Sequence, residues 1–293
     1  MIQTSQTVAI QVGGYEAHPI PTGIFGLDGG AMFGTVPKVL WQKTNPADDN
    51  NMCTWAMRCL LVEDGNRLIL IDTGIGNKQS EKFFSHYYLH GNATLDSSLK
   101  KLGFHRDDIT DVFLTHLHFD HVGGAVVRNG EALHPAFKNA TYWSNPKHWD
   151  WAVNPNEREK ASFFKENIIP IQESGQLKFI GTEDGINFTK DFDVRFVSGH
   201  TESMMLPLIN YKGRKILYMA DLLPSTGHLP LPYVMGYDMF PLTTLAEKKL
   251  FLNEALENDY VLYFEHDPVN ECCTLQQTEK GIKVKDTFKL SEI

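Results

Sequence analysis

The sequence lacks the features that mark several large classes of protein. It has no apolar run long enough to span a bilayer, and residues 1–7 hold neither a basic segment nor an apolar core, so we expect neither a membrane partner nor a secretory signal. Its four cysteines show no C-x-x-C spacing, and Cys272 and Cys273 are adjacent and poorly placed to bridge each other. These features disfavour a zinc ribbon or a redox dithiol, and they predict a reducing, cytoplasmic location.

Positive charge is also scarce. The chain has 27 Lys and Arg against 36 Asp and Glu, a net charge of -9, and no basic cluster. Because proteins that bind a phosphate backbone need basic patches, we expect no nucleic-acid partner. The 293 residues suit one large domain or two small ones. Without a long linker, a low-complexity segment or a short repeat, the interpretation is a single domain over residues 1–293.

Strand patterns dominate both halves of the chain, with helical patterns between them. A hairpin is predicted at 57–62 and 67–71 around an Asp-Gly-Asn turn, and a glycine-rich loop at 26–34. Thr94 and Gly103 are typical of the two ends of a helix. The other predicted strands are 7–13, 112–114, 141–143, 177–181, 193–198, 204–210, 215–219 and 260–264, and the helices are about 79–89, 95–102, 146–152, 157–167 and 244–257. This α+β pattern predicts two mixed sheets packed face to face and covered by helices.

The most informative segment is THLHFDH, residues 115–121, which directly follows the apolar strand at 112–114. It gathers three imidazoles and a carboxylate into six positions. Unpaired polar groups are costly to bury, so such a cluster at the end of a buried strand indicates a metal or catalytic site. A lone histidine would more often be a surface residue or a satisfied core residue.

The spacing within this segment divides its ligand-type side chains into two sets. In extended backbone, residues two apart point the same way, so His116 and His118 can hold one metal ion while Phe119 turns into the protein. Asp120 and His121 follow where the chain bends, and they face a neighbouring position. One loop therefore offers two adjacent nitrogen and oxygen sites, and water bound to such metals becomes a nucleophile near neutral pH.

Three more ligand-type residues, His200, Asp221 and His266, follow apolar strands. Taken singly, each has a structural explanation. His200 fits an exposed loop position, Asp221 a helix cap or turn, and His266 a polar position at a sheet edge. Together they repeat one pattern, in which a buried strand ends in a metal-type ligand, as functional groups above a sheet scaffold do. Asp72 ends a further apolar strand and is either a turn acceptor or a residue that orients a ligand.

These residues resemble the motifs of the metallo-β-lactamase superfamily. The resemblance rests on Asp72-Thr73-Gly74, on the H-x-H-x-D-H pattern at 116–121, and on the order and spacing of His200, Asp221 and His266. It implies a four-layer αββα sandwich with metals at one edge. Within the superfamily the chain resembles the quorum-quenching N-acyl-homoserine lactonases, through the metal loop and through residues 28–38, 219–224 and 233–238.

The resemblance implies a dinuclear hydrolase. His116, His118 and His200 would form a first metal position, Asp120, His121 and His266 a second, and Asp221 would bridge them. Two Zn²⁺ ions suit these ligands, with Mn²⁺, Co²⁺ or Fe²⁺ left open. A hydroxide held between the metals would open the lactone, and Asp120 could relay a proton, which makes Asp120 and Asp221 the candidate catalytic residues.

Two positions depart from the lactonase pattern. Pro224 stands where one lactonase type has a tyrosine that contacts the substrate carbonyl, and Ser225, Thr226, His228 or a nearby Tyr is left open as its substitute. The motif around His200 lacks the Pro-Gly that often follows this histidine. The metal role is unaffected by either change.

The substrate is expected to be a small ester or lactone, and a homodimer is left open. A phosphotriesterase or arylesterase on the same site is the main alternative; a β-lactamase, a nuclease and a di-iron redox module fit less well, and a non-catalytic metal-stabilised module is the last option. Met32, Phe33 and Trp41 either line an apolar groove for an acyl chain or pack in the interior.

Overall fold

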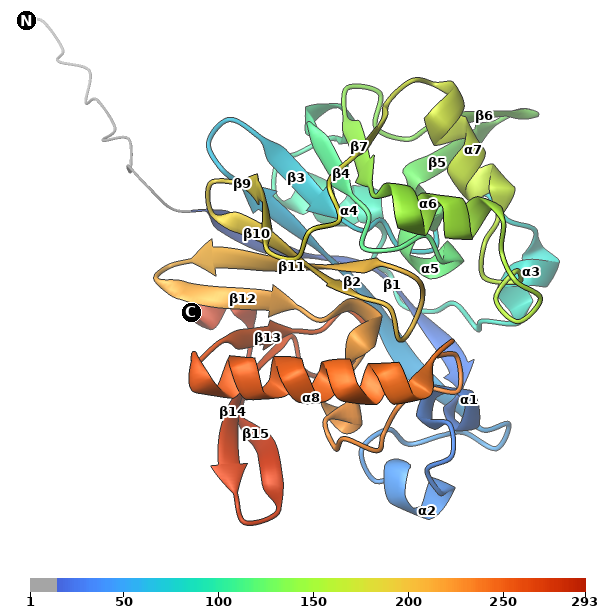
Figure 1. The fold of residues 1–293 in the computed structure, drawn as a ribbon. Helices are drawn as coiled ribbons and strands as arrows, with labels where there is room; N and C mark the ends of the chain where they lie inside the picture. The colour runs from blue at the N-terminus through green and yellow to red at the C-terminus, as the bar shows by residue number, and fades with distance from the viewer. Residues whose placement is uncertain (1–14) are drawn as a thin grey trace, which may run out of the picture.

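The computed structural model describes residues 15–293, which form two large β-sheets with helices on their outer faces (Figure 1). The strand predicted at 7–13 lies outside the described residues. The first sheet has the order β1-β2-β3-β4-β7-β8, with β1 at Glu16–Asp28, β2 at Met52–Glu63, β3 at Leu68–Ile71, β4 at Asp111–Phe113, β7 at Thr141–Ser144 and β8 at Leu177–Phe179. Strands β5 (Val126–Asn129) and β6 (Ala132–Pro135) form a separate two-stranded sheet.

The second sheet comes from the C-terminal half of the chain. Its order is β15-β14-β13-β12-β11-β10-β9, with β9 at Ile186–Thr189, β10 at Phe192–Val197, β11 at Met204–Tyr211, β12 at Arg214–Tyr218, β13 at Val261–Tyr263, β14 at Cys272–Thr278 and β15 at Gly281–Phe288. The predicted hairpin in the first sheet is confirmed, since β2 and β3 pair antiparallel with Leu60 opposite Ile71.

The main core lies between the two sheets. Successive strand residues point to opposite faces, so Leu60 and Val62 of β2 face the second sheet, whereas Cys59 and Leu61 face the helices outside the first. On that outer face lie α4 (Leu95–Lys101), α6 (Pro146–Val153) and α7 (Lys165–Glu173). The apolar side of α8 (Pro241–Glu257) packs on the second sheet. The chain thus has the predicted α+β fold, a four-layer αββα sandwich.

The helix signals at Thr94 and Gly103 are confirmed. The Thr94 hydroxyl accepts a hydrogen bond from the Ser97 backbone N–H at 3.1 Å, and Gly103 ends the turn after α4 with a φ of +86°. The helix predicted at 79–89 is shorter, with α3 at Glu81–Ser85. Two short helices, α1 (Gly29–Phe33) and α2 (Lys38–Trp41), follow β1.

Two expectations about local structure were wrong, and one hairpin was not expected. The loop predicted at 26–34 is the end of β1 followed by α1, because the Asp28 carboxylate accepts from the Ala31 N–H at 2.7 Å and begins a helix. Most of the helix predicted at 157–167 is a series of turns at 157–162, since the Asn156 side chain accepts the backbone N–H of Glu159 and closes a local turn, and the helix begins only at Lys165 as α7. The β14–β15 hairpin, which follows β13, was not predicted.

Strand direction explains where the site forms. Strands β3 and β4 are parallel, and so are β12 and β13, so in each pair the carboxyl ends meet at one edge. Asp72 follows β3 and the segment 115–121 follows β4, while Asp221 and His266 each lie three residues beyond the end of β12 and β13. Within residues 15–293, none of the helices combines the length and apolar character needed to cross a bilayer.

Candidate metal centre

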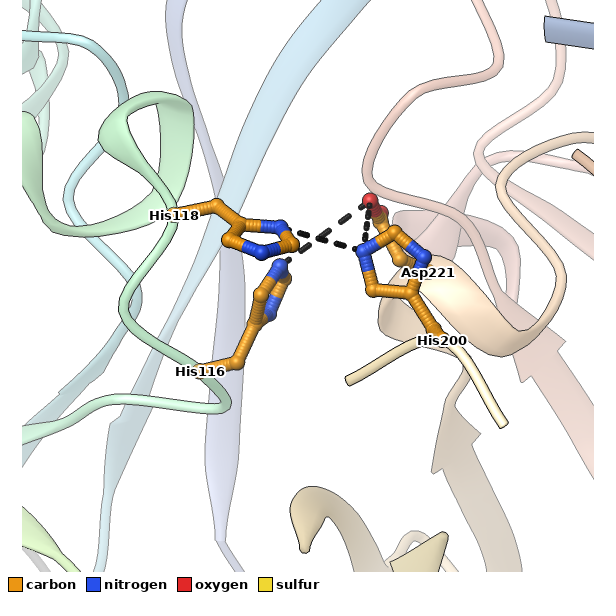
Figure 2. Close-up of side chains that lie close together, drawn as sticks. All are labelled: His116, His118, His200 and Asp221. Atoms are coloured by element: carbon orange, nitrogen blue, oxygen red, sulfur yellow. Dashed lines mark hydrogen bonds and ion pairs between the residues drawn. The ribbon is translucent and has the colours of Figure 1, made fainter. Parts of the chain in front are cut away.

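The residues of the first metal position lie together, as the sequence predicts (Figure 2). His116, His118, His200 and Asp221 each offer a ligand atom within 4.8 Å of the others. His118 Nδ1 is 3.1 Å from His200 Nε2, and His200 Nε2 is 3.2 Å from Asp221 Oδ2. The extended backbone at His118, with φ -65° and ψ 152°, lets both imidazoles of the H-x-H pair face this point.

The residues of the second metal position lie beside them. A single helical turn, α5 (Phe119–Val122), redirects the chain after His118, so Asp120 and His121 face His266. The two Nε2 atoms of His121 and His266 are 3.1 Å apart. Asp120 Oδ2 lies 3.9 Å from His266 Nε2 and 4.0 Å from His121 Nε2, which leaves space for an ion between these side chains.

Asp221 lies between the two positions, and each of its carboxylate oxygens faces one of them. Oδ2 is 3.2 Å from His200 Nε2, while Oδ1 is 3.1 Å from His266 Nε2 and 3.5 Å from His121 Nε2. A carboxylate in this orientation can bind two cations at once, one through each oxygen. The arrangement therefore has the geometry of a bridging ligand.

The chemistry of the donor set fits divalent metal ions. Within the described chain, His116 Nε2 and Asp221 Oδ1 are buried and have no hydrogen-bond partner, which is costly unless a cation satisfies them. Imidazole nitrogens and carboxylate oxygens without thiolates suit Zn²⁺ and related ions. The assignment of individual ligands to metals stays a prediction.

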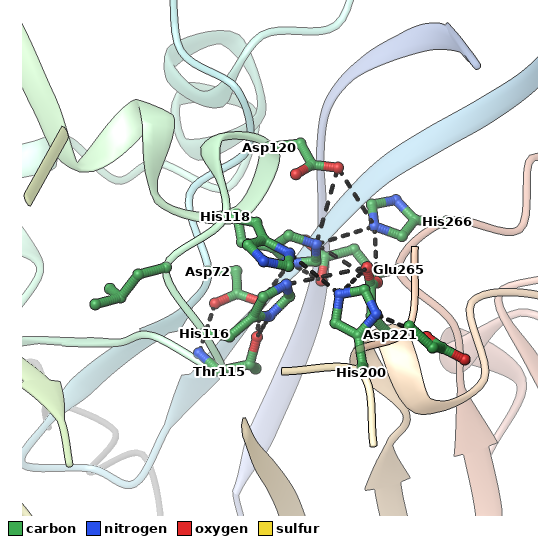
Figure 3. Close-up of polar contacts among 12 residues, drawn as sticks. Asp72, Thr115, His116, His118, Asp120, His200, Asp221, Glu265 and His266 are labelled. Carbon is green, nitrogen blue, oxygen red and sulfur yellow. Dashed lines mark hydrogen bonds and ion pairs between the residues drawn. The ribbon is translucent and has the colours of Figure 1, made fainter. Parts of the chain in front are cut away.

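Each imidazole is held by its other ring nitrogen, and Figure 3 shows Thr115 and Asp72 beside His116. The partners are Thr115 Oγ1 for His116 at 3.0 Å, Glu159 Oε1 for His118 at 2.9 Å, Asp72 Oδ2 for His121 at 3.1 Å, Asp238 Oδ1 for His200 at 2.9 Å and the Ala56 carbonyl for His266 at 2.7 Å. These contacts fix the ring orientation and leave one nitrogen of every ring free to bind a metal.

Of the two roles that the sequence leaves open for Asp72, a turn acceptor or an orienting residue, its contacts fit the second. Its carboxylate accepts the Thr115 backbone N–H at 2.8 Å and the Thr115 hydroxyl at 2.6 Å, besides the His121 ring N–H. Because the Thr115 hydroxyl donates to Asp72, it must accept from His116 Nδ1. One buried carboxylate thereby positions ligands of both metal positions.

Burial and charge act differently on the individual imidazoles. Burial lowers the pKa of His116 well below its usual value, and the neighbouring His121 ring adds to this effect. Burial also opposes charge on His266, but the Asp221 carboxylate outweighs it and raises the pKa of His266 to about 9. In the same way, Glu265 and Asp221 raise the pKa of His121. At the first position Asp221 and Asp238 likewise outweigh burial and raise the pKa of His200, so nearby carboxylates favour positive charge at both metal positions.

Three carboxylates of the site were not predicted from the sequence. Glu159 holds His118 and comes from a segment of turns that shows no motif, whereas Asp238 holds His200 and ends the segment 233–238 that resembles the lactonases, where it was given no role. Glu265 lies 3.1 Å from His121 Nδ1, and its position beside His266 was the one available signal. Trp151 also supports the site, since its ring N–H donates to Glu159 at 2.6 Å.

A cavity of about 320 Å³ opens onto both metal positions. Its apolar wall contains Met32, as one interpretation of the sequence proposed, but Phe33 and Trp41 are buried and stack on each other at 5.2 Å between ring centroids. The other apolar and aromatic lining residues are Leu27, Tyr87, Phe119, Ala161, Met235, Tyr237 and Met239, and the polar ones beyond the predicted ligands are Arg158, Glu159 and Ser162.

The candidates for the residue that replaces tyrosine at Pro224 can now be compared. Ser225 and His228 are buried and bonded to each other at 2.8 Å, and Thr226 donates to Asp267 at 2.7 Å. The described residues that line the cavity include none of these three, whereas Tyr87 and Tyr237 do line it. A nearby tyrosine therefore fits this role better than the residues that directly follow Pro224.

The model of the metallo-beta-lactamase superfamily matches residues 58–266, more than half of the chain. The chain therefore belongs to this superfamily, which confirms the resemblance drawn from the motifs. It is a hydrolase-type domain of the superfamily with lactonase-like neighbours and a His/Asp cluster that could bind metal.

Known structures cover almost the whole chain. A probable metal-dependent hydrolase from Staphylococcus aureus is 27% identical, with a TM-score of 0.84 over 96% of this chain and 100% of that chain. AidC, described as a dizinc quorum-quenching lactonase, is 24% identical, with a TM-score of 0.77 over 96% and 97%; at this identity the likeness shows the fold alone.

Sequence relatives match a smaller part. An N-acyl homoserine lactonase from Bacillus thuringiensis is 28% identical over 130 residues, which are 41% of this chain and 45% of that protein. The chain spans less than half the length of the curated relatives that it matches.

Proposed function

We propose that the protein is a dinuclear zinc-dependent hydrolase that opens the lactone ring of N-acyl-homoserine lactones. His116, His118 and His200 would hold one metal, Asp120, His121 and His266 the other, and Asp221 would bridge them. The observation that carries this proposal is the orientation of Asp221, whose two carboxylate oxygens lie 3.2 and 3.1 Å from imidazoles of different metal positions. The names of the lactonase relatives support the choice of substrate.

Bound divalent metals would supply an activated water near neutral pH and polarise the lactone carbonyl. The protein itself contributes position and proton transfer. Asp120 lines the cavity next to both metal positions, so its carboxylate can take or relay a proton at the reacting centre. The apolar wall, with three methionines among its residues, gives an acyl chain an adaptable surface.

Tyr237 is the side chain that we propose in place of the lactonase tyrosine. It lines the cavity with 38% of its surface exposed, and its partial burial together with the charges of Tyr87 and Asp120 raises the pKa of its phenol. The hydroxyl therefore keeps its proton at neutral pH and can donate a hydrogen bond to a substrate carbonyl. It belongs to the same loop as Asp238, which holds His200.

The test incubates the purified, zinc-loaded protein with short- and long-chain acyl-homoserine lactones. Hydrolysis is measured through the acid that ring opening releases. We expect hydrolysis, and its loss in Asp120→Ala and His118→Ala with the thermal unfolding profile largely kept. His105→Ala, which removes an exposed histidine outside the cavity, is the matched control. Full activity in either site variant would defeat the residue assignment.

A substrate panel separates the reaction classes, because paired metal positions can serve carbonyl or phosphoryl substrates. The panel contains aryl esters and phosphotriesters beside the lactones, at equal enzyme concentration. We expect the highest kcat/KM with a lactone. A higher value with a phosphotriester or an aryl ester would keep the dinuclear site and replace the proposed substrate.

A further inference from the structure

Glu265 is a buried carboxylate beside the second metal position that the proposed mechanism does not use (Figure 3). It is 0% exposed and directly precedes His266 after β13. Its Oε2 lies 3.1 Å from His121 Nδ1, and its Oε1 accepts a weak hydrogen bond from the Cys59 thiol at 3.9 Å. Within residues 15–293, no Lys or Arg forms an ion pair with it.

His121 differs from the other imidazoles of the site because two carboxylates face its outer nitrogen. Asp72 Oδ2 and Glu265 Oε2 are both 3.1 Å from His121 Nδ1. A ring nitrogen carries only one hydrogen, and its hydrogen bond goes to Asp72. Glu265 Oε2 is consequently buried without a hydrogen-bond partner in the described part of the chain.

A buried carboxylate oxygen without a donor, such as Glu265 Oε2, is strongly unfavourable unless positive charge compensates it. His121 connects Glu265 with the second metal position, because its Nε2 faces that position while its Nδ1 faces Glu265. A cation held by His121 Nε2 would make the Nδ1 side of this ring more positive. The negative charge of Glu265 in turn makes His121 a stronger metal ligand.

None of the three imidazoles of the first metal position has two carboxylates at its outer nitrogen, as His121 does. His118 and His200 each contact one carboxylate, Glu159 or Asp238, and His116 contacts the neutral Thr115 hydroxyl. The second position also holds Asp120 as a direct anionic ligand candidate. The two positions should therefore bind a metal ion with different strength.

We propose that Glu265 is a positioning residue that makes the second metal position the tighter of the two, so that the first metal to bind occupies the site of Asp120, His121 and His266. This inference rests on the proposed dinuclear function. Beyond the proposed function, it says which metal position fills first and names Glu265 as the residue that causes this order.

The experiment titrates the metal-free protein with Zn²⁺ in competition with a chromophoric chelator. For Glu265→Gln we expect the affinity of the tighter step to fall roughly ten- to a hundredfold, the loss that follows when a group supporting a metal ligand is removed. The weaker step should stay within about threefold, because the other ligands are untouched. Glu159→Gln, which removes the support of His118, is the matched control and should weaken the other step.

Anomalous diffraction at the zinc edge, from crystals grown with one equivalent of Zn²⁺, identifies the position that fills first. The wild-type protein should show density between Asp120, His121 and His266, and Glu265→Gln should move density to the first position or divide it between both. If Glu265→Gln does not fold, Glu265→Asp withdraws the carboxylate from His121 and should cause a smaller loss in the same direction.

The outcomes separate the two proposals. Wild-type protein that binds no zinc contradicts the proposed function itself. Wild-type protein that binds two zinc ions, with unchanged stepwise affinities in the Glu265 variant, contradicts only the role of Glu265. Density that first appears at His116, His118 and His200 in the wild-type protein also overturns this inference.

Discussion

Asp221 is the residue on which both metal positions depend. Burial alone would raise its pKa, but the imidazoles of His121, His266 and His200 outweigh burial and hold that pKa well below its usual value. The side chain is therefore an anion that faces both positions with one oxygen each. The negative charge of Asp221 and its two acceptor oxygens should affect metal binding and hydrolysis, and one substitution tests both effects.

Asp221→Asn keeps the shape of the side chain but removes the negative charge and one acceptor. We expect bound zinc to fall from two ions to about one per chain, and lactone hydrolysis to fall on the order of a hundredfold or more, as when charge stabilisation is lost from an active site. Elemental analysis and a ring-opening assay measure the two effects. Two tightly bound zinc ions in this variant would show that Asp221 does not bridge.

Tyr237→Phe tests the phenol proposed to contact the substrate. The substitution keeps the ring in the cavity wall and removes only the hydroxyl, so we expect kcat to fall on the order of a hundredfold while metal content stays unchanged. Tyr87→Phe is the comparison, since burial and the Asp120 charge raise the pKa of Tyr87 to about 12 and its ring packs on Phe119. If only Tyr87→Phe lowered kcat, the role would belong to Tyr87.

At the scale of elements, α6 connects the two loops that carry the first metal position. His148 accepts the Leu117 backbone N–H at Nε2, at 2.9 Å, and donates from Nδ1 to the Glu202 carbonyl at 2.6 Å. Burial lowers the pKa of His148 to about 4, so the ring is neutral and can make both bonds near pH 7. Loops from the two sheets are thus held at a fixed separation.

His148→Ala leaves the buried Leu117 N–H and the partly buried Glu202 carbonyl without partners. We expect the free energy of unfolding to fall by about 3 kcal/mol or more, since each unsatisfied group costs about 1–3 kcal/mol and a cavity is added. Urea unfolding of the metal-free protein measures the change, and His105→Ala is the control. A change below about 1 kcal/mol would mean that other contacts hold the loops.

Asp111 connects three neighbouring strands of the first sheet. It begins β4 and accepts hydrogen bonds from the Arg67 Nε before β3, at 2.8 Å, and from the Trp143 ring N–H in β7, at 2.7 Å. Burial alone would raise the pKa of Asp111, but these donors outweigh burial and lower it. A carboxyl with a lowered folded pKa stabilises the fold above its unfolded pKa, and this stabilisation is lost as the pH falls through the folded pKa.

For Asp111 this window begins near pH 4 and extends downward. We expect Asp111→Asn to lower stability at pH 5 by about 1–3 kcal/mol and to flatten the decline in stability below pH 4. Urea unfolding between pH 5 and pH 2, with a chelator present to exclude metal effects, gives both curves. Two parallel curves would show that another group causes the acid sensitivity.

Local patterns made most elements and all seven ligand candidates predictable. His116 and His118 follow a buried strand with a spacing that extended backbone turns to one side, and Asp221 and His266 repeat the strand-end position. Glu159 was not predictable, because its part in the site depends on turns at 157–162 and on contacts with distant His118 and Trp151. Hydrogen bonds across the fold decide such positions, and one sequence does not record them.

At the scale of the whole molecule, the sandwich explains how ligands from distant segments meet. Packing of the two sheets through one core brings the ends of β4, β10, β12 and β13 together, although these strands come from different halves of the chain. The fold and the superfamily were thus recoverable from the sequence. A single domain over all 293 residues, a homodimer and a cytoplasmic location stay predictions.

The central claim is that two divalent ions bind side by side, one in each group of ligand atoms that Asp221 joins. Its most direct test is the metal content of the wild-type protein by elemental analysis, after loading with zinc and dialysis against metal-free buffer. The account predicts about two zinc ions per chain. A protein that retains less than one ion per chain, while remaining folded, would contradict it.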